Sequence, residues 1–162
     1  YGGMLFITSE GDHVESTQLA VPQGLFDLLV LVYAGPRMRD GSDIIQAQMA
    51  TYNVKALHRQ KQLAREMRDA LAKGDLRGFG ELLDEAWRCK KEMYPGVSTP
   101  EIDNLHDRAL ALGAVAAQLM GAGSGGYMLL MEDPGHQGEL RDNLVRANIP
   151  YHNLEMDILG VQ

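Results

Sequence analysis

The chain has 162 residues, of which 45% are hydrophobic and 23% are charged, with a formal net charge of −7. This composition is typical of one packed domain and excludes a disordered chain. The acidic balance disfavours nucleic acid and anionic membranes as partners, because both require a basic surface. No apolar run approaches the ~20 residues of a membrane-spanning helix. The single cysteine, Cys89, leaves no internal disulfide and suits a cytoplasmic protein.

The N-terminal segment is predicted to form strands. The segments 4–9 and 14–19 are rich in β-forming residues, and Gly11-Asp12 between them is typical of a two-residue hairpin turn. The run 25–33 is apolar at nearly every position, which indicates a buried central strand.

Helices are predicted in the middle of the chain. A short helix over 42–51 precedes a longer one from about Val54. The apolar residues of the longer helix recur at four-residue spacing along one face: Leu63, Met67 and Leu71. Gly74 is placed to end this helix and Asp75 to cap the next, so we expect two antiparallel helices.

The segment 98–101, Ser-Thr-Pro-Glu, is a strong start signal for a further helix. It offers a hydroxyl cap, a proline in the first turn, and a glutamate three residues after Ser98. We expect this helix to stop at Gly113. Two strands then follow, 114–120 and 127–131, on either side of a glycine-rich loop.

The last part of the chain is predicted to be a helix and a strand. Asp133-Pro134 is placed to cap a helix that runs to about Asn148. The segment 151–158 alternates as an edge or half-exposed strand does. His152 lies on its otherwise apolar face, which indicates a hydrogen-bonded core histidine.

This order of elements predicts a single α+β domain over residues 1–162, with a mostly antiparallel sheet covered on one face by helices. The five histidines do not pair at metal-ligand spacing, so neither a metal site nor a catalytic residue is predicted. Arg37 and Arg39, close to Asp40 and Asp43, could bind a substrate phosphate, but a solvated helix start explains the same residues.

The strongest functional candidate is the loop Gly121-Ala122-Gly123-Ser124-Gly125-Gly126. Glycine permits positive φ and lets successive amides approach an anion. The loop fits G-x-G-x-x-G, but a strand follows it where a dinucleotide site needs a helix. No Gly-Lys-Ser/Thr follows, so it is not a P-loop. A hairpin that only turns the chain remains the alternative, although four glycines exceed what a turn requires.

Residues 118–127, Gln-Leu-Met-Gly-Ala-Gly-Ser-Gly-Gly-Tyr, resemble the third motif of the GHMP kinases. The resemblance is strongest to the D-glycero-D-manno-heptose 7-phosphate kinase branch and covers nearly the whole chain, including 31–35, 79–83 and 90–91. This sequence departs from the family where Lys and Ser/Thr usually precede the first glycine, because Gln118 and Met120 stand there. A cation and a hydroxyl are thereby lost from the motif.

The resemblance implies the C-terminal domain of an ATP-dependent sugar or sugar-phosphate kinase, with a ferredoxin-like core. In that family an N-terminal domain supplies the main phosphate loop and a catalytic carboxylate, and neither is found in this sequence. The first residue is Tyr1 rather than Met. We therefore expect a portion of a longer kinase, inactive alone, whose missing domain holds most of the ATP and Mg²⁺.

Within this interpretation the loop 121–126 would face the phosphates, while Arg37 and Ser98 would meet the substrate. The alternative is a non-catalytic α+β module that binds a small ligand. Such a module could also form a homodimer by pairing strand 151–158 edge to edge with a second copy.

Overall fold

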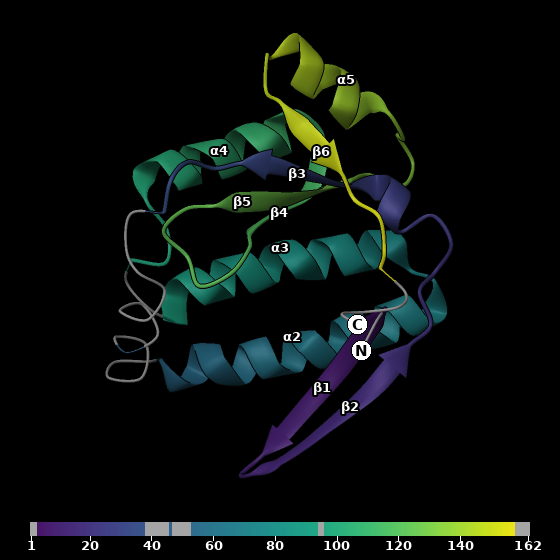
Figure 1. The fold of residues 1–162 in the computed structure, drawn as a ribbon, viewed down its shortest axis with the longest axis vertical. Coiled ribbons are helices and arrows are strands. Elements are labelled where there is room, and N and C mark those ends of the chain that lie inside the picture. Colours follow the sequence, from purple (N-terminus) through teal and green to yellow (C-terminus); the bar gives the residue numbers. More distant parts are fainter. Residues whose placement is uncertain (1–2, 38–45, 47–52, 94–95, 158–162) are drawn as a thin grey trace.

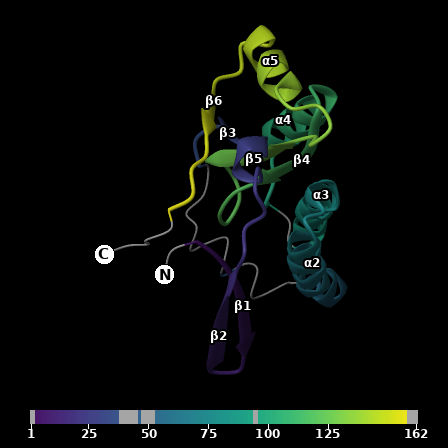
Figure 2. The ribbon, with the colours of Figure 1, turned by 90° about the vertical axis from the view of Figure 1, so that its right-hand side faces the viewer.

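The computed structural model describes residues 3–37, 46, 53–93 and 96–157. The predicted helix over 42–51 lies outside these residues except for position 46. The described strands form two antiparallel sheets, a two-stranded hairpin and a four-stranded sheet with the order β4-β5-β3-β6. The N-terminal hairpin projects away from the larger sheet (Figures 1 and 2).

The hairpin consists of β1 (Met4–Glu10) and β2 (His13–Leu19), as the sequence predicts. Its register runs from Met4 opposite Leu19 to Glu10 opposite His13. Gly11 has φ 59°, which suits the first central position of a type II′ turn. Most of the hairpin's side chains are exposed, including Ile7 and Val14.

The larger sheet contains β3 (Leu29–Tyr33), β4 (Ala114–Leu119), β5 (Tyr127–Glu132) and β6 (Tyr151–Asn153), and each paired strand runs antiparallel to its neighbour. The prediction of one strand over 25–33 is wrong in its first half, because Phe26–Leu28 form the 3₁₀ turn η1. Leu25 and Leu28 are fully buried, so the apolar run there reflects burial and not extended backbone.

The two predicted antiparallel helices are α2 (Val54–Lys73) and α3 (Leu76–Met93). The Asn53 side chain caps α2, and Gly74 ends it in the left-handed conformation with φ 70°. Asp75 then accepts a hydrogen bond from the Gly78 amide at 2.9 Å, as a cap should.

The remaining helices are α4 (Pro100–Ala111) and α5 (Glu139–Arg146). Thr99, rather than Ser98, caps α4 by accepting from the Ile102 amide at 3.3 Å. The last helix starts later than predicted, at the N-cap Gly138. Asp133 instead closes a turn by accepting from the Gly135 amide, which accounts for the misplaced start.

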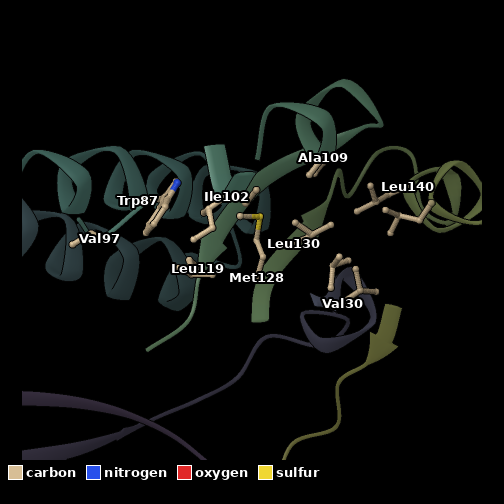
Figure 3. Close-up of a cluster of buried hydrophobic side chains, with 13 residues drawn as sticks. Val30, Trp87, Val97, Ile102, Ala109, Leu119, Met128, Leu130 and Leu140 are labelled. Atoms are coloured by element: carbon tan, nitrogen blue, oxygen red, sulfur yellow. The ribbon is translucent and has the colours of Figure 1, made fainter. Parts of the chain in front are cut away.

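Helices cover one face of the larger sheet, and α2, α3 and α4 lie on the same side of it in Figure 2. Alternate residues of the strands point into this layer and pack on α3, α4 and α5, with Trp87 fully buried (Figure 3). Together β3, the helices, β4, β5, α5 and β6 follow the β-α-β-β-α-β order of ferredoxin-like folds. The α+β prediction is confirmed.

The opposite face carries exposed aromatic residues near the glycine loop. Tyr33 and Tyr127 are 56% and 42% exposed, and their ring centroids lie 5.5 Å apart. His152 on the edge strand β6 is also exposed, with its ring 6.1 Å from that of Tyr127. The prediction of a core histidine is therefore wrong, because β6 presents His152 on this open face.

A buried ion pair joins α3 to α4. Asp84 accepts a hydrogen bond from His106 Nε2 at 2.9 Å, and Arg88 also binds Asp84. The side chains of Asp84 and His106 are buried. The hydrogen bond to Asp84 raises the pKa of His106 despite its burial, with Asp107 supporting the charge and Lys91 opposing it. Burial raises the pKa of Asp84, but His106 and Arg88 outweigh it and lower the pKa overall.

This pair predicts a stability maximum in mildly acidic solution. The stability contributed by protonated His106 is complete below its ordinary pKa of about 6.5 and is lost as pH rises through the raised value in the fold. Asp84 contributes above its ordinary pKa of about 3.9 and loses this contribution as pH falls through its lowered value. Urea unfolding at a series of pH values should show the unfolding free energy falling with rising pH on the alkaline side and falling with decreasing pH on the acidic side.

Two variants check the assignment. His106→Gln should remove the slope above pH ~6.5, whereas His58→Gln, on the exposed surface of α2, should leave it unchanged. Asp84→Asn should lower the unfolding free energy by about 3 kcal/mol, because it leaves a buried imidazole without its counter-charge. A slope that persists in His106→Gln would assign the pH dependence to another group.

Candidate functional site

The glycine-rich loop joins β4 to β5 at one end of the sheet. The Met120 amide donates to the Tyr127 carbonyl at 2.9 Å and closes the loop at its base. The loop lies beside the C-terminal end of α3 (Figure 1), because Lys90 Nζ donates to the Gly121 carbonyl at 2.6 Å. The segment after β3 also reaches the loop, where the Gly126 amide donates to the Gly35 carbonyl at 2.9 Å.

The second half of the loop is held by the domain's own backbone. The Ser124 amide donates to the Val97 carbonyl at 2.9 Å, and a Cβ on Gly123 would lie 2.8 Å from that same oxygen. A Cβ on Gly125 would collide with the Pro36 carbonyl. Both glycines have positive φ, 122° and 142°. Glycine is therefore required here by contacts inside the domain.

The first half of the loop is open. Gly121 is exposed and Ala122 is partly exposed, whereas residues 123–125 are buried. Within the described part of the chain, the amides of Gly121 and Ala122 donate to no protein acceptor. Gly121 has φ 80°, and a Cβ built on it would meet only the Arg37 side chain, at 3.7 Å from Nη2. This end of the loop therefore presents free backbone amides that a ligand could reach.

Two cations meet at Gly121. Lys90 from α3 donates to its carbonyl, and the guanidinium of Arg37, from the segment after β3, lies 3.7 Å from the position that a Cβ on Gly121 would take. Burial lowers the pKa of Lys90. The sequence indicates a role for Arg37, and the structure places its guanidinium at the loop. From the sequence alone, Lys90 is noticed only as part of the family resemblance. Nothing in its spacing along α3 indicates that its side chain reaches residue 121.

Ser98 belongs to a separate polar network. Its hydroxyl donates to Asp103 Oδ1 at 2.9 Å, and Lys91 pairs with the same oxygen at 2.9 Å. Burial raises the pKa of Asp103, but the bonds from Lys91 and Ser98 outweigh it and lower the pKa overall. This network secures the start of α4 against the end of α3. The Ser98 hydroxyl is thus engaged within the domain.

Ser124 supplies the hydroxyl of the loop itself. It adopts a positive φ of 59°, which is uncommon for a residue with a side chain, and it is only 3% exposed. Its Oγ has no hydrogen-bond partner among the described residues. Gln118 lies on β4 and Met120 directly follows it.

The sequence-predicted residues Arg39, Asp40 and Asp43 lie outside the described residues. In the described part of the chain, no three His, Cys, Asp or Glu side chains gather as metal ligands would. None of its helices is long and apolar enough to cross a bilayer. A recess of about 820 Å³ lies between the hairpin and α2, away from the loop, and is lined by polar as well as apolar residues of these elements.

Comparison with known proteins assigns the sequence to a family. The model of the family described as "GHMP kinases C terminal" matches residues 67–150. The chain is 34% identical over 95 residues to the D-glycero-alpha-D-manno-heptose 7-phosphate kinase of Campylobacter jejuni subsp. jejuni serotype O:2, a match that covers 59% of this chain and 27% of that kinase. It is 44% identical over 68 residues to the galactokinase of Thermococcus kodakarensis, covering 42% of this chain and 19% of that enzyme.

The fold is also found in solved structures. The mevalonate kinase of L. major, solved in complex with R-mevalonate, superimposes with a TM-score of 0.72 at 19% identity. The superposition covers 99% of this chain and 51% of the mevalonate kinase chain. The chain thus spans about half the length of that structure and less of the curated relatives it matches.

Because one half of the loop is packed and the other is open, a methyl group added to a glycine should lower the unfolding free energy by different amounts in the two halves. Gly125→Ala should lower the unfolding free energy by about 3 kcal/mol, because it combines a left-handed backbone with a collision against the backbone of residue 36. Gly121→Ala, the matched control, should cost about 1 kcal/mol, because it meets only a movable side chain. Chemical denaturation measures both. Equal losses would mean that the whole loop is packed alike.

Proposed function

The chain belongs to the GHMP kinase family by the match to its C-terminal domain, and on this premise we propose that it is the C-terminal portion of an ATP-dependent sugar or sugar-phosphate kinase. The curated relatives support a sugar acceptor, since one is named a heptose 7-phosphate kinase and another a galactokinase. We infer that the phosphorylated acceptor of the former is the better guide, because it has the longer match.

The observation that carries the proposal is the open end of the glycine loop. Phosphoryl transfer depends on positioning the reactants and on neutralising charge at the phosphates. The free amides of Gly121 and Ala122 can position a phosphate by donating hydrogen bonds to its oxygens, which also stabilises its negative charge. The anchored residues 123–126 hold these amides in place, so the loop needs little reorganisation when an anion arrives.

The residues that the structure describes contribute little of the remaining machinery. A kinase of this family uses ATP and Mg²⁺, and the described residues gather no carboxylate cluster for a metal ion. We propose that an N-terminal domain outside this chain holds Mg²⁺ and most of the nucleotide, and that it also supplies the base or orienting carboxylate. In this proposal the loop 121–126 closes one wall of the site between the two domains, and the parent kinase acts in the cytoplasm.

The proposal predicts activity for the parent protein and none for the 162-residue chain. ADP release in the presence of ATP and Mg²⁺ should be measured for both, with heptose, mannose and fucose phosphates and with free galactose as acceptors. We expect turnover with at least one acceptor by the parent and none above background by the chain alone. Turnover by the chain alone would refute the assignment of the catalytic parts to another domain.

Gly121→Val in the parent tests the loop itself. A branched side chain at the open end should obstruct the amides. We expect kcat/KM to fall about 100-fold or more, as it does when an enzyme loses one hydrogen-bond donor to an oxyanion. Val145→Ala, at an exposed position of α5, is the control and should leave kcat/KM unchanged. A parent that binds a sugar but never consumes ATP would favour the non-catalytic binding module.

A further inference from the structure

Lys90 stands apart from the other partly buried cations. In the described part of the chain, each of the others pairs with a carboxylate: Arg59 with Glu66 and Glu85, Arg68 with Asp69, Lys91 with Asp103, and Arg141 with Glu132. Lys90 has no carboxylate within ion-pair distance among these residues; its ammonium donates to the neutral carbonyl of Gly121 and lies 6.0 Å from the centre of the Trp87 ring. A partly buried ammonium without a counter-charge is costly to keep.

Arg37 is likewise unpaired among the described residues, and its guanidinium approaches the same glycine. The protein as a whole carries a net charge of −7, so two uncompensated cations at one residue are a marked local concentration of positive charge. They come from elements far apart in the sequence, α3 and the segment after β3, and the fold brings both to the open end of the loop. A negatively charged ligand is the simplest partner for these two cations.

The surrounding neutral groups point to an anion of a particular kind. The free amides of Gly121 and Ala122 are hydrogen-bond donors, as are the ammonium and the guanidinium. A site made only of donors matches a group that carries only acceptors, such as a phosphate. The guanidinium can bind two phosphate oxygens in one plane, and the ammonium acts as a compact point charge.

We propose that Arg37 and Lys90 bind a phosphate group against the amides of Gly121 and Ala122. Gln118, just before the loop, is uncharged, and Lys90 brings a cation to the loop from α3. The inference rests on the proposed function for the source of the phosphate, either the sugar-phosphate acceptor or the nucleotide. The site itself does not depend on that choice.

Binding of inorganic pyrophosphate to the 162-residue chain tests the site directly. Backbone amide NMR shifts should change at residues 121 and 122 on titration, and calorimetry should give the affinity at constant ionic strength. We expect Lys90→Gln and Arg37→Gln each to weaken binding about tenfold or more. Lys73→Gln removes the same charge at the exposed end of α2 and should leave the affinity unchanged. Absence of binding, or equal weakening in all three variants, would overturn the proposal.

The same variants in the parent enzyme distinguish the two sources of phosphate. If Lys90→Gln raises KM about tenfold for a phosphorylated sugar and not for ATP, the group belongs to the acceptor. The reverse result assigns it to the nucleotide, and unchanged KM values for both would overturn a role in either substrate. A parent without kinase activity, combined with pyrophosphate binding that Lys90→Gln removes, would refute the proposed function and leave the anion site standing.

Discussion

The backbone contact between the glycine loop and residue 97 is the constraint on which the site depends. The Ser124 amide donates to the Val97 carbonyl, and Gly123 can pack against that carbonyl only because it lacks a Cβ. Val97 is itself part of the main core, which also contains Trp87 and Ile102 (Figure 3). The loop is thereby fixed to the same packing that joins α3, α4 and the sheet, and its position follows from the core.

The glycines of the loop therefore serve two different purposes. Gly123 and Gly125 allow two backbone segments of the domain to approach each other, which a hairpin turn alone would not require. Gly121 has no such neighbour and leaves its amide accessible. A motif that sequence comparison treats as one unit is divided physically into an anchored part and an open part. The rigid, anchored part keeps the amides of the open part in a fixed position. This matters because an anion site loses affinity if its hydrogen-bond donors must first be ordered.

Sequence patterns predicted the strands on both sides of the loop, the helices α2 and α3 with Gly74 between them, and the α+β class. These features depend on local periodicity and capping, which neighbouring residues determine. The patterns failed where burial imitates a strand, as at Leu28, and where Asp133 closes a turn instead of capping a helix. They could not show that Lys90 reaches Gly121, because that contact depends on how α3 packs beside β4.

The charge distribution explains why such a site can exist on an acidic domain. Carboxylates neutralise the other partly buried cations among the described residues, and several of these pairs hold elements together, as Lys91 with Asp103 joins α3 to α4. Lys90 and Lys91 are adjacent on one helix, yet among the described residues only Lys91 pairs with a carboxylate. Pairing Lys90 as well would stabilise the domain but would cancel the positive potential at the loop. An unpaired cation beside free amides is thus a cost in stability that an anionic ligand can offset, which is the physical reason to connect this corner with phosphate.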